Sequence, residues 1–230
     1  LLKFELDRRS YLRRLRETAR RFDISVLDYV ITSNHIHLLL RAAQAGQVSR
    51  AMQYLQGLTA RDCNRRKRRS GAFWCDRFNP TLVENGPHLS RCIYYIGLNM
   101  VRAGAVAHPG EWNACGFHEL AGQRQRYRIL DLPALLQCLG MPGRVREFRD
   151  WYVSTLGRMC GARYLCREPH WTEAAAVGSL SWIESLAKSV VIGHKQVIPL
   201  ESAVAAAVGE EERSYALKLS PHQCRKLWQP

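Results

Sequence analysis

Apolar residues recur along this chain with two periods, one typical of helices and one typical of strands. Residues 7–22 and 47–67 carry apolar side chains every three to four positions, so we expect an amphipathic helix over each. Ile24–Thr32 is apolar on both alternations, as in a strand that is covered on both faces. HIHLLLRA, residues 35–42, predicts a second strand after a short Ser33-Asn34 step, and the two strands are expected to pair as a hairpin.

Two further elements are expected before residue 104. Phe78–Glu84 is a weaker strand candidate, because Pro80 removes a backbone donor. Pro87–Ala103 predicts a helix that has a proline in its first turn and stops at Gly104.

The pattern changes in the second half of the chain. Residues 106–125 are rich in Gly, Pro, Trp and His and predict irregular structure, and helices are expected beyond it over 132–139, 145–156 and 180–188. We place a soft boundary near residue 125. Residues 1–125 would form one domain of α+β class, and 126–230 a mainly helical C-terminal extension that is a candidate DNA-binding region.

The composition limits the classes of molecule that this protein is expected to bind. Lys plus Arg is 34 and Asp plus Glu is 20, which leaves a net charge of +14 and favours a polyanion: nucleic acid first, an acidic membrane second. No apolar run is long enough to cross a bilayer, so we expect no membrane partner. The 8 cysteines include no C-x-x-C pair, which excludes a zinc ribbon and indicates reduced thiols in the cytoplasm.

The first candidate for chemistry is the pair His35 and His37. Two positions apart on a strand, both imidazoles project from the same face and make half of a metal site. The alternative is a pair of half-buried histidines that bond to backbone, and the pair taken by itself favours that alternative.

The second candidate is Tyr95 with Asn99, which lie on one helix face at i and i+4. A phenol can attack phosphorus and form a covalent phosphotyrosine. An amide oxygen from Asn99 would join the two histidines as a ligand of Mg²⁺ or Mn²⁺. Helix packing is the alternative role for Tyr95. The adjacent Tyr94 falls in register with an apolar stripe and is expected in the core.

The third candidate is a basic run that ends the second predicted helix and is followed by aromatic residues. We expect its cations to follow a phosphate backbone while aromatic faces stack on unpaired bases. The alternative is a solvated charge run ahead of a core Phe-Trp pair. The expected DNA contacts are Arg65, Arg66, Lys67, Arg68, Arg69, Trp74 and Arg77, with Phe73 beside Trp74.

These motifs together resemble those of the IS200-like tyrosine transposases, a Y1 family of HUH nucleases, and in particular their REP-associated branch. The matching strings are YVITSNHIHLLLRA, FWCDRF, YIGLNMVRAGAV and, in the C-terminal part, WTEAAAVGS. They stand in the family's order from about residue 7 to about residue 186, and four ordered motifs are far more specific than one.

The resemblance implies a ferredoxin-like antiparallel sheet with helices packed on it. It implies cleavage and rejoining of single-stranded DNA at hairpin-forming sites, through a 5′-phosphotyrosine and a free 3′-OH. Position by position, His35 and His37 match the metal-binding pair, Tyr95 the nucleophile and Asn99 the third ligand. Arg102 either contacts phosphate or packs within the fold. A cytoplasmic, nucleoid-associated bacterial protein, monomeric or homodimeric, is expected.

The chain departs from the family at three places. Ser33 and Met100 stand where the family has prolines, and neither position touches the chemistry. The family's first strand precedes the opening helix, and here only LLKFEL remains to supply it, so either residues precede Leu1 or this is a decaying copy. Two alternatives stay open: a hairpin-binding protein that has lost turnover, and a zinc hydrolase built on H-x-H, which no nearby carboxylate cluster supports.

Overall fold

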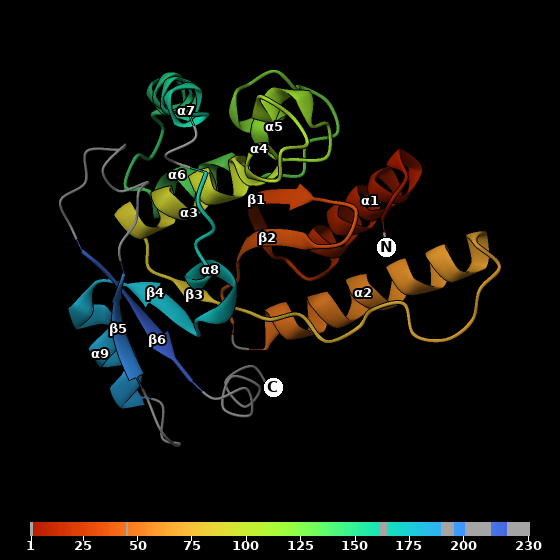
Figure 1. The fold of residues 1–230 in the computed structure, drawn as a ribbon, viewed down its shortest axis with the longest axis horizontal. Coiled ribbons are helices and arrows are strands. Elements are labelled where there is room, and N and C mark those ends of the chain that lie inside the picture. Colours follow the sequence, from red (N-terminus) through yellow and green to blue (C-terminus); the bar gives the residue numbers. More distant parts are fainter. Residues whose placement is uncertain (1, 45, 162–164, 190–195, 201–212, 220–230) are drawn as a thin grey trace.

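The computed structural model describes residues 2–44, 46–161, 165–189, 196–200 and 213–219, and its fold is of the predicted α+β class (Figure 1). No helix in these ranges is long and apolar enough to cross a membrane. The elements run α1 (Glu5–Arg21), β1 (Ser25–Ile31), β2 (Ile36–Arg41), α2 (Gln47–Arg66), β3 (Leu82–Val83), α3 (Pro87–Gly97), α4 (Asn99–Arg102), η1 (Pro109–Glu111), α5 (Phe117–Leu120), α6 (Leu132–Cys138), α7 (Val145–Met159), α8 (His170–Glu173), β4 (Ala176–Gly178), α9 (Leu180–Ser189), β5 (Gln196–Leu200) and β6 (Ser214–Lys218).

The predicted hairpin is present. β1 and β2 pair antiparallel, with His37 opposite Val30, and a register shift lies between Val26 and Asp28. Within the described ranges β2 pairs with β1 alone, and no strand precedes α1. The chain before α1 instead reaches the hairpin turn, where the Leu2 N–H donates to the Ser33 carbonyl at 2.8 Å. The resemblance implied a ferredoxin-like sheet. Among the described residues, the part of that sheet that is present is the β1–β2 hairpin.

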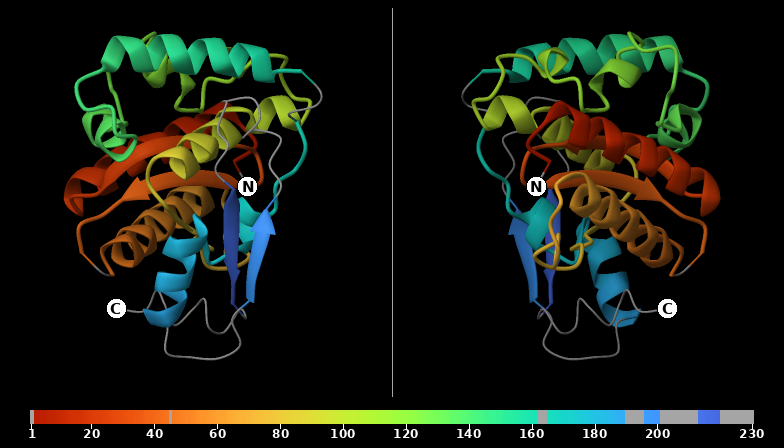
Figure 2. Two further views of the ribbon diagram at one scale, coloured as in Figure 1. Left: turned by 90° about the vertical axis from the view of Figure 1, so that its left-hand side faces the viewer. Right: turned by 90° about the vertical axis from the view of Figure 1, so that its right-hand side faces the viewer.

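Helices cover both faces of the hairpin, as its continuous apolar sequence requires. On one face, α1 and α2 pack through Leu15 and Leu55 against a cluster that includes Tyr29. On the other face, α3 and α7 belong to the cluster that includes Val30. α7 lies across the outer side of α3 (Figure 2), where Gly97 leaves room for the Tyr152 hydroxyl.

A second sheet has the strand order β3-β4-β6-β5. β3 pairs parallel with β4, and β6 runs antiparallel to both β4 and β5. The sequence pattern predicted β3 and α9, but it did not predict β4, β5 or β6. The hydrophobic cluster beside α3 continues past residue 125 into α6 and α7. The division of the chain at residue 125 therefore stays a prediction.

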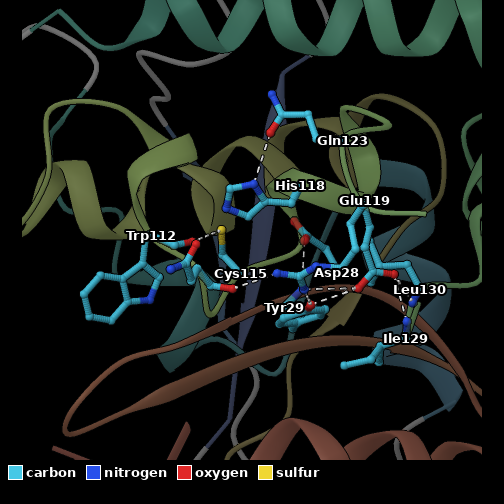
Figure 3. A network of polar contacts seen from close by, with 11 residues as sticks. Asp28, Tyr29, Trp112, Cys115, His118, Glu119, Gln123, Ile129 and Leu130 are labelled. Atoms are coloured by element: carbon cyan, nitrogen blue, oxygen red, sulfur yellow. Dashed lines mark hydrogen bonds and ion pairs between the residues drawn. The ribbon is translucent and has the colours of Figure 1, made fainter. Parts of the chain in front are cut away.

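The outer edge of β1 is covered by the irregular stretch after α4. The Ile31 N–H donates to the Ala114 carbonyl at 2.9 Å, and the Gly116 N–H to the Tyr29 carbonyl at 2.8 Å. Below this edge the Tyr29 hydroxyl donates to Glu119 Oε1 at 2.9 Å (Figure 3). Glu119 is buried and also accepts backbone N–H bonds at residues 129 and 130, so it ties that segment to the hairpin.

Asp28 is a buried carboxyl within this network. Its Oδ1 accepts the Tyr29 N–H at 2.8 Å, whereas its Oδ2 has no hydrogen-bond partner among the described residues. A side chain at Gly116 would collide with it, so this close approach requires glycine. Burial raises the pKa of Asp28 well above its ordinary 3.8, and the negative charge of Glu119 raises it further.

We expect Asp28→Asn to raise the thermal unfolding midpoint at pH 8 and to change it little at pH 4. The folded carboxyl stays protonated while the unfolded one ionises above about 3.8, so stability falls as pH rises from there through the raised folded pKa. An amide removes this loss. Circular dichroism melts at pH 4, 6 and 8 test it, with the exposed Asp150→Asn as control. An equal shift at all three pH values would contradict the expectation.

Candidate active site

The two histidines project from the face of the hairpin that α3 covers. His37 lies on β2 and is half-buried, and His35, just before β2, is more exposed. Their ring centroids are 5.0 Å apart with planes at 72°. The alternation of a strand thus places the pair side by side, as the sequence predicted.

Asn99 reaches His35 from the first residue of α4. Its Oδ1 lies 3.3 Å from His35 Nε2, while His35 Nδ1 lies 2.9 Å from Asn34 Oδ1. The predicted helix over 87–103 is in fact two helices, because the backbone at Leu98 has ψ 0° and ends α3. Asn99 therefore meets His35 across a helix break rather than from an unbroken i, i+4 face.

Tyr95 faces His37 from α3. The two ring centroids are 6.0 Å apart and the planes meet at 80°. The tyrosine is 5% exposed. Arg102 lies over its ring, with the guanidinium carbon 4.0 Å from the centroid, and also donates to the Tyr95 carbonyl at 3.1 Å. Both roles expected for Arg102 fit this position, since it packs within the fold beside the candidate nucleophile.

Tyr94 points the other way. It is fully buried, and it stacks on Tyr152 with centroids 5.8 Å apart and contacts Trp151 edge-on at 5.2 Å. Successive residues of a helix are about 100° apart, which sends the two adjacent phenols to different surroundings. Of this pair, Tyr95 is the one beside the histidines.

Burial sets the charge state of the site. Burial, together with the charges of the neighbouring His35 and Arg102, lowers the pKa of His37 to about 4, and burial also lowers the pKa of His35. Both imidazoles are therefore neutral at pH 7, the form that can bind a metal. Burial raises the pKa of the Tyr95 phenol, and the Arg102 charge opposes that rise.

The side chains of His35, His37 and Asn99 fit a divalent cation by their chemistry and their proximity. Among the residues that the structure describes, no group of three or more His, Cys, Asp and Glu side chains is placed to hold a metal ion. The set here is two neutral imidazoles and one amide oxygen, and the His35–Asn99 contact shows that the amide reaches the imidazole. Imidazole nitrogens suit divalent transition metals, and an amide oxygen suits Mg²⁺ or Mn²⁺, so the set offers ligands of both kinds.

Sequence reasoning missed a group from the C-terminal part that closes one side of Tyr95. The Trp171 ring centroid lies 6.1 Å from that of Tyr95, and the Trp171 indole N–H donates to Glu168 Oε2 at 2.7 Å. His170 Nε2 is 3.8 Å from the same carboxylate oxygen. The negative charge of Glu168 raises the pKa of Tyr95 and so opposes Arg102. The WTEAAAVGS string marked this segment in the sequence but did not place it beside Tyr95.

The structure separates the predicted DNA contacts into two groups. Arg66 and Lys67 both pair with Asp7, a carboxylate that is 1% exposed, and thereby join the end of α2 to the start of α1. Four other arginines of the group have no such buried partner among the residues that the structure describes: Arg65, Arg68, Arg69 and Arg77 are all exposed, with Arg69 donating to a backbone carbonyl and Arg65 at 3.9 Å from Asp62.

The two aromatic residues after this run belong to the core beside α2. Phe73 is 4% exposed and contacts Trp74 edge-on at 4.9 Å. The Trp74 indole N–H donates to the Gln56 carbonyl at 2.9 Å. The expected stacking of bases on Phe73 is therefore wrong, because its ring is covered. The half-buried Trp74 stays a predicted DNA contact.

Replacing arginines at the end of α2 by uncharged glutamine is expected to distinguish the residues that bind DNA from those that stabilise the fold. Arg65→Gln with Arg68→Gln should weaken single-strand binding and lower the salt slope by about 1.4, because about 0.7 is lost per phosphate contact. Arg66→Gln should instead lower the free energy of unfolding by about 1 kcal/mol, since Asp7 keeps Lys67 as a partner. Denaturant melts and salt titrations of binding test both. An unchanged slope in the double variant would remove the α2 end from the DNA interface.

Residues 2–98 match the family model described as "Transposase IS200 like". No curated protein and no solved structure matches. The matched stretch runs from the start of the described chain through Tyr95 and ends one residue before Asn99, so the place of Asn99 in the site rests on geometry.

Proposed function

We propose that this protein, whose residues 2–98 match the IS200-like transposase family, cleaves and rejoins single-stranded DNA at hairpin-forming sites, with Tyr95 as the nucleophile. The observation that carries the proposal is the convergence of Tyr95, His37, His35 and Asn99 on one face of the hairpin. A REP-associated element is the proposed target class.

In the proposed reaction the Tyr95 hydroxyl oxygen attacks the scissile phosphorus. The new bond is Tyr95 O–P, the bond to the 3′ oxygen breaks, and the phenol proton ends on the 3′-OH that leaves. The reverse attack by a 3′-OH restores the phosphodiester and the tyrosine, so the bond energy is conserved and no nucleotide cofactor is needed. Arg102 favours the phenolate, because its charge lowers the pKa of Tyr95.

His35, His37 and Asn99 would hold Mg²⁺ or Mn²⁺. Such an ion, when bound, supplies charge neutralisation at the phosphate. The chain's own contribution is to present neutral imidazoles and to orient one of them, since Asn34 contacts His35 Nδ1 and leaves Nε2 toward Asn99. Tyr95 is oriented in turn by Arg102 and Trp171, which pack against its ring.

DNA labelled at one end tests the proposal. The protein is incubated with Mg²⁺ and a pool of DNA hairpins that carry randomised single-stranded flanks, labelled at either the 5′ or the 3′ end. A 5′-phosphotyrosine predicts that the 3′ label migrates with the protein on a denaturing gel, while the 5′ label is released on a shorter strand. A fully duplex pool should give no adduct.

Three outcomes would contradict the proposal. Binding without any adduct across the pool would assign the protein to the inactive hairpin binders. A 5′ label on the protein would reverse the proposed polarity. An equal yield with the duplex pool would remove the requirement for single strands.

A further inference from the structure

A basic groove lies outside the candidate active site, along the side of α1 that faces away from the C-terminal end of α2. Its volume is about 790 Å³, and it lies between α1 and residues 111–129. Six arginines and two glutamates line it, so its walls are strongly positive. Arg13 and Arg16 also line a second hollow along α1, together with Glu17, Arg20 and Arg21, so the net positive track continues toward the end of that helix.

Aromatic rings stand among these arginines. Tyr127 is 78% exposed, and the Arg16 guanidinium carbon lies 5.6 Å from its ring centroid. Its backbone is in the left-handed region at φ 55°, which a bulky residue rarely adopts, so the local fold holds this large apolar ring in solvent at a cost. At the other end of the groove, Arg8 lies over the Trp112 ring at 4.8 Å.

An unsatisfied donor lies in the same place. The Nε of Arg16 is buried and has no hydrogen-bond partner within the described chain. A buried donor without an acceptor is costly. The same guanidinium lines the groove, and guanidinium groups bind phosphate oxygens well. Arg13 and Arg126 are exposed and provide further positive charge on the two walls.

The groove joins the turn that carries His35. The Trp112 indole N–H donates to the Ile31 carbonyl at 3.0 Å, at the end of β1. On the opposite wall, Arg8 donates to the Leu2 carbonyl, and the Leu2 N–H donates to the Ser33 carbonyl of the hairpin turn. These bonds hold Trp112 and Arg8 against the two ends of the turn that carries His35.

We propose that this groove binds an unpaired flank of the DNA, with phosphates on the α1 arginines and a base stacked on Tyr127. The identity of the ligand rests on the proposed function, whereas the location of the groove does not. Cations that track a backbone beside an exposed aromatic face bind single strands, whose bases are free to stack, whereas a duplex keeps its bases inside. The groove thus distinguishes a flanked hairpin from a blunt one.

Fluorescence anisotropy in EDTA tests this with a labelled DNA hairpin that carries a ten-nucleotide flank and with the same hairpin made blunt. Tyr127→Ala is expected to weaken binding of the flanked hairpin roughly tenfold and to leave the blunt one unchanged, while Tyr127→Phe keeps wild-type binding. Arg13→Gln with Arg126→Gln should lower the salt slope by about 1.4. Arg146→Gln with Lys188→Gln removes equal charge from exposed positions that do not line the groove and serves as control.

Unchanged binding in both groove variants would overturn the proposal. Equal loss for blunt and flanked hairpins would assign the groove to the duplex stem and overturn it as well. Photocrosslinking from 5-bromodeoxyuridine in the flank should map to Tyr127 or Trp112, and crosslinks confined to the α2 end would contradict it. At saturating DNA the groove variants should still form the Tyr95 adduct, so a protein that binds through the groove but forms no adduct would refute the nuclease proposal alone.

Discussion

Tyr95→Phe is expected to abolish the covalent protein–DNA adduct while the protein still folds and binds DNA. The substitution removes the attacking oxygen and keeps the ring that packs against His37, Trp171 and Arg102. Loss of a nucleophile of this kind costs on the order of 10⁴-fold or more in rate. The measurement is adduct yield on a denaturing gel, with anisotropy of the same DNA to show that binding is kept.

Tyr94→Phe is the matched control, because it makes the same change one residue earlier. Tyr94 is buried against Tyr152 and Trp151, away from the histidines, so its loss should leave cleavage nearly normal. Peptide mapping that found the DNA on Tyr94 would overturn the assignment.

Replacement of either histidine is expected to remove metal-dependent cleavage. His35→Ala and His37→Ala each delete one imidazole of the proposed site, and Asn99→Ala deletes the amide oxygen 3.3 Å from His35. Loss of outer partners of metal ligands costs about 10–100-fold in affinity or activity, so loss of a ligand itself should cost at least about 100-fold. Titration of Mn²⁺ followed by electron paramagnetic resonance measures affinity directly, separately from turnover.

Two controls keep the metal prediction falsifiable. His37→Gln retains most of the side-chain volume, so a loss shared with His37→Ala is not a packing effect. His118→Ala removes a histidine that contacts Gln123 instead, and it should keep wild-type Mn²⁺ affinity. Full cleavage in EDTA, or unchanged Mn²⁺ affinity in His37→Ala, would exclude the metal role.

Local patterns predicted the elements whose burial follows one period. The β1–β2 hairpin and helices α1, α2, α6, α7 and α9 lie where the apolar spacing placed them, within a few residues at the ends. Strands β4 and β6 were missed, because three to five residues are too few to show a period, and their partners lie far away in sequence. The helix break at Leu98 was missed although Gly97 stands just before it, because an isolated glycine is also tolerated inside a helix.

The sequence by itself determined which chemical groups are available and which of them share a face. Alternation on a strand puts His35 and His37 together, and the helical angle separates Tyr95 from Tyr94. The tertiary structure decided which basic residues are available to bind DNA. In the sequence, an arginine that faces solvent looks the same as one that, like Arg66, pairs with the buried Asp7. Contacts between distant segments have no local signature. Trp171 beside Tyr95 is one such contact, and the groove between α1 and Tyr127 is another.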